Sequence, residues 1–386
     1  MKYWFGLFFG LITTSAIAQT KEPDTTMGFE EYNPASTLVV PGASLLRAKY
    51  PFVDVHGHQY NMPEQDLSEV IAAMDTLNMG VMVNLSGRGV KRTPAGFDVN
   101  TPEHLVKSIE KIGQEYPGRF VLFTNISFMG IGREGWTEKA VQQLEEDVQQ
   151  GAKGLKIYKN LGMNVKDTDE NRVPVDDKRL DPIWAKCGEL GIPVLIHSAD
   201  PKPFWLPMDS TNERWLELKT RPNRQRSDTD PAPWEQIIQE QHHVFEKHPN
   251  TMFINAHMGW YANNLDQLGT LLEIYPNMYV GIGAIIAELG RQPRQARRFF
   301  IQYQDRVLFG KDSWQPDEFP TYFRVLETAD EYFPYHKKYH AFWPMYGMDL
   351  PDEVLRKVYY ENALRLIPGI DASLFPGPQK TELRGN

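Results

Sequence analysis

Four histidines and one aspartate each stand at the end of a short apolar run, and side chains of this kind can bind a metal ion. They are His56, His58, His197, His257 and Asp312. One residue separates His56 from His58, so in a strand both side chains point to the same face. Imidazoles and a carboxylate together suit Zn²⁺ or a similar divalent ion. The pattern therefore predicts a divalent metal centre, most simply a single zinc ion.

Such a centre can activate water. A catalytic metal lowers the pKa of a bound water to about 7, and a nearby carboxylate can take the proton. We therefore expect Asp312 both to contact the metal and to act as general base, with His257 and Lys156 as further catalytic residues. Lys156 can pair with Asp312 or with a substrate carboxylate. If it is carboxylated, it can also bridge two metals.

The elements that must position these residues are eight short runs rich in β-formers. They cover residues 51–58, 80–86, 119–127, 154–159, 193–199, 251–258, 277–284 and 306–312. Most of these runs are continuously apolar, as is typical of parallel strands buried on both faces. The segments between them have apolar spacings of three to four and often end in Gly or Pro, which indicates helices.

Eight strand–helix units in a row predict an α/β fold, a (β/α)8 TIM barrel. The alternative is a doubly wound open sheet, but no G-x-G-x-x-G motif follows the first strand. In a barrel, the candidate residues all fall at the carboxyl ends of strands, where active sites are built. The other histidines lie in predicted helices or loops, where a structural role is expected; they are His104, His242, His243, His248, His336 and His340.

Two connections are long enough to form walls or lids over the site, at residues 200–232 and 313–345. Residues just beyond strand ends are the predicted substrate contacts. They are Arg88, Trp205, Trp260 and Arg291. An aromatic wall with an arginine suits a small aromatic or cyclic substrate.

The amino terminus predicts export. Lys2, an apolar run at 3–12 and Ala16-Ile17-Ala18 form the pattern of a signal peptide over residues 1–18, cleaved after Ala18. The protein is then expected to be periplasmic or secreted. The predicted organisation continues with a leader at 19–50, the barrel at 51–368 and a carboxyl-terminal tail at 369–386.

Composition limits the partners. The 386 residues carry a net charge of −9 with no prominent basic run, so we expect a small-molecule substrate and no nucleic acid. No later stretch has transmembrane length, so no stable membrane insertion is expected after cleavage. The sequence leaves open whether the protein forms a homo-oligomer. A single cysteine, Cys187, excludes an intramolecular disulfide and a multi-thiolate metal site.

These residues carry a family likeness. From about Phe52 to Pro368 the chain resembles the amidohydrolase superfamily, within it the branch of aminocarboxymuconate-semialdehyde decarboxylase-like proteins. The motifs are Asp54-Val55-His56-Gly57-His58, Gly154-Leu155-Lys156, His197, Ala256-His257-Met258-Gly259, Gly310-Lys311-Asp312-Ser313 and Glu361-Asn362-Ala363.

The resemblance implies a distorted TIM barrel with a metal at its mouth. By position, His56, His58, His197 and Asp312 match metal ligands. It also implies that His257 polarises the substrate or binds a second metal. Lys156 aligns with the lysine that is carboxylated in two-metal members, whereas the decarboxylase-like branch uses one metal. A small residue usually precedes the strand-eight aspartate, where this chain has Lys311.

The reaction expected is hydrolysis of an amide, ester or lactone bond of a small, cyclic or aromatic substrate by metal-activated water, because an exported enzyme meets external substrates. The alternative is a metal-dependent lyase, a non-oxidative decarboxylase or hydratase of an aromatic or unsaturated acid. A non-catalytic binding protein is not favoured, since none of the expected ligand residues is missing.

Overall fold

The computed structural model describes residues 26–28, 31–32, 34–42, 45–93, 96–337 and 343–377. The chain separates into two units, Met1–Leu38 and Val39–Asn386, and every helix and strand among the described residues lies in the second. The predicted signal peptide and residues 378–386 of the predicted tail lie outside the described residues. Among the described helices, none combines the length and the apolarity that crossing a membrane requires.

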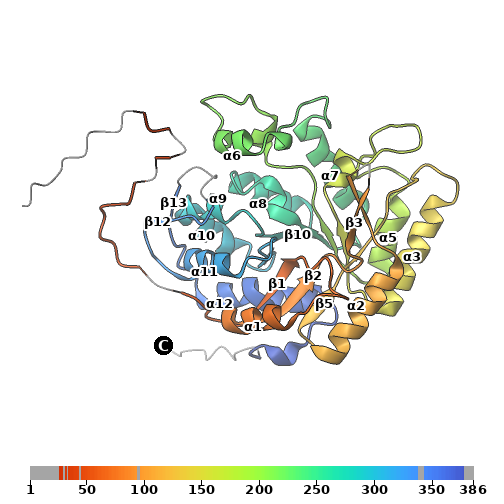
Figure 1. Cartoon of the computed structure of the whole chain (residues 1–386), viewed down its shortest axis with the longest axis horizontal. Helices are drawn as coiled ribbons and strands as arrows, with labels where there is room; N and C mark the ends of the chain where they lie inside the picture. Colours follow the sequence, from red (N-terminus) through yellow and green to blue (C-terminus); the bar gives the residue numbers. More distant parts are fainter. Residues whose placement is uncertain are drawn as a thin grey trace, which may run out of the picture. The chain divides into compact units, whose positions relative to one another are not determined.

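Parallel strands follow one another around the second unit (Figure 1). In chain order they are β1 (Phe52–Gly57), β2 (Met79–Asn84), β5 (Phe120–Leu122) with β6 (Thr124–Asn125), β7 (Leu155–Ile157), β8 (Val194–Ile196), β9 (Phe253–Asn255), β10 (Met278–Gly281) and β11 (Val307–Leu308). One sheet has the order β1-β2-β5 and the other runs from β6 in sequence to β11. Phe123 alone separates β5 from β6, so the two sheets are continuous there.

The ring closes between the first strand and the last. The backbone N–H of Val55 donates to the Phe309 carbonyl at 3.0 Å, and the N–H of Asp312 donates to the His56 carbonyl at 2.8 Å. These bonds join β1 to the chain leaving β11, so the order is that of a barrel rather than an open sheet. The predicted TIM barrel is confirmed.

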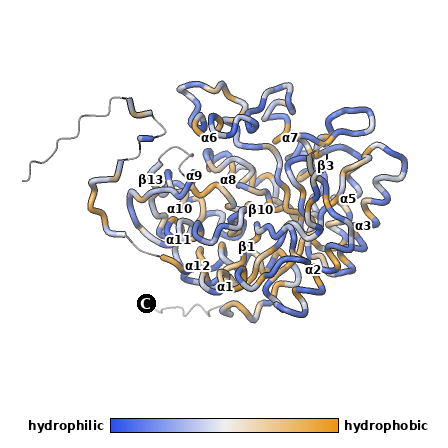
Figure 2. Tube along the Cα trace, viewed as in Figure 1, coloured by the Kyte–Doolittle hydropathy of each residue, from blue (hydrophilic) through white to orange (hydrophobic). Residues whose placement is uncertain are grey.

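Helices connect and cover the strands, with apolar and polar positions alternating along their traces (Figure 2). The barrel helices are α1 (Ser68–Leu77), α2 (Pro102–Glu115), α3 (Trp136–Gln150), α5 (Asp181–Glu189), α7 (Trp234–Lys247), α8 (Leu265–Ile274), α10 (Pro293–Gln302) and α11 (Phe319–Glu327). The chain then continues through α12 (Asp352–Arg356), a π-helical turn (Lys357–Glu361) and α13 (Asn362–Leu366).

Smaller elements decorate the loops. Two antiparallel hairpins pair β3 (Val90–Thr93) with β4 (Gly96–Val99) and β12 (Phe333–Pro334) with β13 (Pro344–Met345). The short helices are α4 (Asn160–Met163), α6 (Trp215–Thr220) and α9 (Ile286–Gly290). The connection at 200–232 contains α6, and the one at 313–345 contains α11 and the second hairpin. The two meet where the Arg214 guanidinium lies 5.7 Å from the Trp343 ring.

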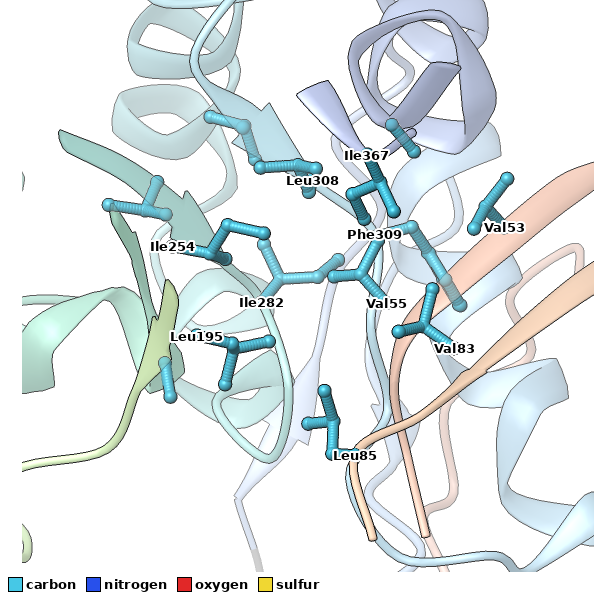
Figure 3. Close-up of a cluster of buried hydrophobic side chains, with 14 of the residues drawn as sticks. Val53, Val55, Val83, Leu85, Leu195, Ile254, Ile282, Leu308, Phe309 and Ile367 are labelled. Carbon is cyan, nitrogen blue, oxygen red and sulfur yellow. The ribbon is translucent and has the colours of Figure 1, made fainter. Parts of the chain in front are cut away.

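The barrel interior is filled by branched aliphatic side chains that converge from different strands (Figure 3). Val55, Leu195, Ile254, Ile282 and Leu308 are all fully buried. Every residue of β1 is buried, the polar Asp54 and His56 included, as expected for a strand covered on both faces. Full burial of each such aliphatic side chain contributes roughly 1.5–3 kcal/mol to the stability of the fold. This packed apolar layer therefore stabilises the barrel beneath the polar residues at its mouth.

A buried histidine outside the site makes stability depend on pH. His242 of α7 packs among the rings of Phe245, Tyr261 and Tyr275, and burial lowers its pKa to about 4. Since the folded pKa lies below the unfolded value of 6.5, His242 contributes stability above that value and loses it as pH falls toward 4. Both proteins are expected to lose unfolding free energy as the pH falls from 6.5 to 4. We expect the loss in His242→Phe to be smaller than in the parent, by up to about 3 kcal/mol. Denaturant melts at both pH values measure this, and equal losses would contradict the assignment.

Candidate metal centre

Three predicted ligands meet at the barrel mouth. Ligand atoms of His56, His58 and Asp312 all lie within 4.8 Å of one another. Each histidine places its Nε2 atom 3.7 Å from Oδ1 of Asp312. The histidines leave the end of β1, and Asp312 follows β11, so the closing seam of the barrel brings them together.

His197 and His257 form a second, adjoining pair. Nδ1 of His257 lies 2.7 Å from the Gly283 carbonyl oxygen, and Nε2 of His257 lies 3.3 Å from Nδ1 of His197. Because a carbonyl can only accept, His257 carries its proton on Nδ1, and its Nε2 accepts the Nδ1 proton of His197. With its proton on Nδ1, His197 has a lone pair on Nε2. That atom is buried and has no hydrogen-bond partner among the described residues.

The two groups lie side by side, since the rings of His56 and His257 are 5.1 Å apart. His197 thus does not belong to the tight group of His56, His58 and Asp312. Its free lone pair is nevertheless the form in which imidazole binds a metal. The structure therefore places all four predicted ligands at one mouth, three of them in close contact.

The protonation states suit metal binding. Burial lowers the pKa of His58 to about 4, and it holds the pKa values of His56 and His197 well below 6.5. All three are therefore neutral near pH 7, as metal ligands must be. Burial acts to raise the pKa of Asp312, but the charges of His257, His58 and Lys156 outweigh it and hold that pKa below 3.8. The carboxylate is thus ionised at neutral pH.

Lys156 of β7 lies inside the barrel with 1% of its surface exposed. Burial lowers the pKa of its amine to about 7. Nζ lies 5.4 Å from the Tyr158 ring and has no hydrogen-bond partner among the described residues. Nδ1 of His56 is likewise buried and unpartnered. Buried polar atoms normally find partners, so a mouth with several unmet donors and acceptors fits a bound divalent ion and substrate.

Several residues at the site have backbone conformations that are unusual for residues other than glycine. Asp312, His257 and Trp260 have φ values of 86°, 57° and 63°, in the left-handed region that costs energy for non-glycine residues. Gly283 sits against His56, and a Cβ there would lie 3.0 Å from its Nδ1. Tight turns and a missing side chain thus let the ring of His56 sit at the mouth.

A family model described as amidohydrolase matches residues 53–369. The chain belongs to the amidohydrolase family. None of the curated proteins matches the chain. Among solved structures, a 2,6-dihydroxybenzoate decarboxylase from Rhizobium is 13% identical, with 82% of this chain and 98% of that chain covered and a TM-score of 0.49.

Two other solved structures are similar to the same degree. A 4-oxalomesaconate hydratase from Rhodopseudomonas palustris is 15% identical, with 84% and 97% of the two chains covered and a TM-score of 0.48. An uncharacterised TIM-barrel protein from Bordetella bronchiseptica is 14% identical, with 82% and 97% covered and a TM-score of 0.49. Likenesses this distant do not select a reaction for this amidohydrolase.

Asp54 ties the two ligand-bearing segments of this amidohydrolase together. Its Oδ1 accepts the backbone N–H of His56 at 2.9 Å and that of Lys311 at 3.1 Å. Burial raises the pKa of Asp54 to about 6. The Lys311 side chain turns away to the Ser313 carbonyl, 2.8 Å distant, and to Glu318. One carboxylate thus holds the backbone of His56 itself and that of Lys311, the residue before Asp312.

We expect Asp54→Ala to lower the unfolding free energy by roughly 2–4 kcal/mol, because two buried N–H groups lose their acceptor. Asp54→Asn is the matched control, since its side-chain oxygen can still accept, and it should cost clearly less. Denaturant melts of the three proteins measure the difference. Equal losses in both variants would show that the seam does not depend on these two hydrogen bonds.

A hydrogen-bond chain orients His58. Nδ1 of His58 lies 2.7 Å from Oγ of Ser86, which lies 2.7 Å from the Tyr158 hydroxyl; that hydroxyl is 3.3 Å from the Leu85 carbonyl. The chain ends on an obligate acceptor, so each group donates to the next, and Nδ1 of His58 carries the proton. The lone pair of Nε2 then faces Asp312. Such supports typically fix the tautomer of a metal-binding histidine.

Removing the hydroxyl should weaken the metal centre. We expect Ser86→Ala to reduce metal affinity about 10–100-fold, because His58 loses the partner that fixes its ring and tautomer. Ser198→Ala is the matched control, since the Ser198 Oγ has no hydrogen-bond partner among the described residues. Competitive titration with a chelating indicator gives both affinities. An unchanged metal affinity in Ser86→Ala would show that the Ser86 hydroxyl does not contribute to metal binding.

The predicted substrate residues are spread over different surroundings. Trp260 lies at the site, stacked on His257 with centroids 4.5 Å apart, and its indole donates to the Ser198 carbonyl. Trp205 donates to the Ala232 carbonyl at 2.8 Å within an apolar cluster under α7. Each of these two indole N–H groups is therefore already paired with a backbone carbonyl.

The two predicted arginines are engaged with protein groups. Arg88 is buried, with Nη1 3.8 Å from the carboxylate of Asp147 in α3. Arg291 lies 3.3 Å from the Trp343 ring and 3.4 Å from the Glu213 carboxylate. Both guanidinium groups thus lie against protein groups, while Nε of Arg88 is buried without a hydrogen-bond partner among the described residues. A substrate contact for either arginine stays a prediction.

Several residues at the mouth were not predicted from the sequence. Ser86 and Tyr158 form the support of His58, and Arg214 and Glu288 form a buried ion pair beside Trp260. Ser86 ends the run at 80–86, so its place at a strand end could have indicated it. Arg214 directly precedes α6 and Glu288 lies in α9, and nothing local in the sequence links them.

Proposed function

We propose that this amidohydrolase is a metal-dependent hydrolase acting on an amide, ester or lactone bond of a small substrate. The observation that supports this most is Asp312, an ionised carboxylate in a buried site, 3.7 Å from both histidine Nε2 atoms. A carboxylate in this place can accept the proton that a water molecule loses as it attacks a carbonyl.

The metal would be held by His56, His58 and Asp312, with Nε2 of His197 as a further ligand, and we propose one zinc ion. When bound, such an ion lowers the pKa of a water molecule and polarises the bond to be broken. His257, through its Nδ1–H bond to Gly283, fixes the ring of His197. Lys156, with a pKa near 7, can hold or release a proton at Nζ beside the reacting bond.

A panel of candidate substrates tests the proposal. Proton release in weakly buffered medium would report hydrolysis of small esters and lactones, and appearance of a free amine or ammonia would report hydrolysis of small amides. Carbon dioxide release would report decarboxylation of aromatic acids, and loss of ultraviolet absorbance would report hydration of unsaturated acids. We expect proton release or a free amine. Carbon dioxide or hydration products without hydrolysis would replace the proposal by the lyase alternative.

We also propose that the protein is exported to the periplasm or secreted, with a mature chain that begins at Gln19. The support is the charged start, the apolar run and the small-residue pattern that ends at Ala18. Fractionation of producing cells and amino-terminal sequencing of the purified protein test this. An intact Met1 on protein recovered from the cytoplasm would contradict it.

A further inference from the structure

The backbone at Asp312 has a conformation that needs support. Its φ of 86° lies in the left-handed region, which costs energy for a residue other than glycine. Such a conformation persists only where neighbouring contacts hold it in place. Relaxation of the backbone would carry the carboxylate away from the Nε2 atoms of His56 and His58, which lie 3.7 Å from its Oδ1 atom. The contacts that hold this turn therefore decide where the carboxylate lies.

Two hydrogen bonds hold the amino-terminal side of the turn. The backbone N–H of Lys311 donates to Oδ1 of Asp54 at 3.1 Å, and the N–H of Asp312 donates to the His56 carbonyl at 2.8 Å. Both bonds lie before the Cα atom of Asp312. The peptide that joins Asp312 to Ser313 lies on the other side of that atom, so these two bonds do not hold it.

The side chain of Lys311 closes the turn from that other side. Its Nζ donates to the Ser313 carbonyl at 2.8 Å, lies 3.3 Å from the Ser313 Oγ and pairs with the Glu318 carboxylate. Only 1% of the lysine side chain is exposed, so little water competes for these bonds. Lys311 thus forms a bridge from the residue before Asp312 to the residue after it.

Glu318 holds the amine of Lys311 and has other polar neighbours as well. It ends the 3-10 turn Pro316–Glu318, and its carboxylate lies 3.5 Å from Nε2 of His336. The charge of Lys337 also acts on it. Replacement of Lys311 would therefore not leave this carboxylate among apolar groups alone, and the contribution of the amine can be tested without isolating a buried charge.

We propose that Lys311 is a positioning residue for Asp312, and that it acts through the hydrogen bond from its amine to the Ser313 carbonyl. This bond holds the left-handed turn, and the turn holds the carboxylate that accepts the proton of the attacking water. The proposal rests on the proposed function and deepens it, because it adds a residue that acts through the base and not on the substrate. The φ of Asp312 and the bridge across it are the observations that support it.

Two variants separate the bridge from the ion pair. Lys311→Met fills a similar space without a donor, so kcat should fall about 10–100-fold while KM changes little, as for a misplaced catalytic group. Glu318→Gln also removes the ion pair, but its side-chain oxygen can still accept from the amine, which keeps its bond to Ser313. This variant should lose similar stability and keep most of kcat. Equal losses of kcat in the two variants would assign the effect to the ion pair and overturn the proposal.

A second measurement does not depend on turnover. Co²⁺ has visible absorption bands that depend on its ligand geometry, so the full chain loaded with Co²⁺ reports the position of Asp312 at the metal. We expect Lys311→Met to shift these bands and Glu318→Gln to leave them close to the parent. Lys247→Met makes the same change at an exposed ion pair with Asp181 and should leave the bands and kcat unchanged. Parental bands in Lys311→Met would overturn the proposal.

Lys311→Gln, whose side chain is shorter, takes the place of Lys311→Met if that variant does not fold. A double variant then shows whether Lys311 acts through Asp312. In the Asp312→Asn background, replacement of Lys311 should have little further effect on kcat, because the group that it positions is gone. Losses that simply multiply would overturn the proposal.

The Co²⁺ bands also keep this test independent of the proposed reaction. Shifted bands in a Lys311→Met protein whose parent has no hydrolase activity would refute the reaction and keep the positioning role. Hydrolysis by the parent with unchanged bands in Lys311→Met would do the reverse.

Discussion

Asp312→Asn is expected to lower kcat by about 100-fold or more on any substrate that the protein hydrolyses. A general base typically contributes about 10²–10⁴ to a rate, and asparagine cannot accept the proton. The effect should be large here because Asp312 is ionised and is the carboxylate of the close group with His56 and His58, where the proton of an attacking water would be accepted. Steady-state kinetics of both proteins, with metal content measured on the same samples, give the result.

The measured metal content separates loss of the base from loss of the metal, and two control variants test whether the effect is specific to Asp312. Asp317→Asn makes the same chemical change five residues along the chain, in a 3-10 turn outside the ligand cluster, and should keep full activity. His104→Ala should also keep it, since His104 lies in α2. Near-normal kcat in Asp312→Asn with full metal content would show that another group accepts the proton.

Removal of the metal is expected to cost both turnover and stability. A ligand that binds the folded state at a free concentration of 1,000 times its Kd adds about 4 kcal/mol to the unfolding free energy. We expect chelator-treated protein to lose that increment and its activity, and added Zn²⁺ to restore both. Thermal and denaturant melts with and without Zn²⁺ measure the increment without any substrate.

A variant shows whether the increment arises at the predicted site. In His56→Ala the group of three close ligands is broken, so added Zn²⁺ should give little or no stabilisation. His243→Ala, at an exposed histidine of α7, should respond to Zn²⁺ like the parent. Full stabilisation of His56→Ala by Zn²⁺ would place the metal elsewhere in the protein.

The strands could be predicted because each is a local pattern. The apolar run at 51–58 contains β1, whose residues are all buried, and the run at 193–199 contains β8. The observed strands are shorter than the runs. β8 ends at Ile196, and Ala199 already has a φ of 58°, because the chain leaves the ladder to turn its polar residues into the mouth.

The barrel and the candidate metal ligands could be predicted from local patterns in the chain. Spacing in a strand fixes the face on which His56 and His58 lie, and polar residues that follow buried runs fall at one mouth. These are local properties, set by the alternation of side chains along a strand and by the burial of apolar runs.

Tertiary structure alone decided how the polar groups pair. Asp54 and Lys311 are 257 residues apart and meet at the closing seam, and Arg214 and Glu288 are 74 residues apart and meet beside Trp260. Arg88 lies with Nη1 3.8 Å from the carboxylate of Asp147, a pairing that its own sequence segment does not indicate, and its substrate contact stays a prediction. The physical reason is that hydrogen bonds and ion pairs depend on distances across the closed ring, and local periodicity carries no information about those distances.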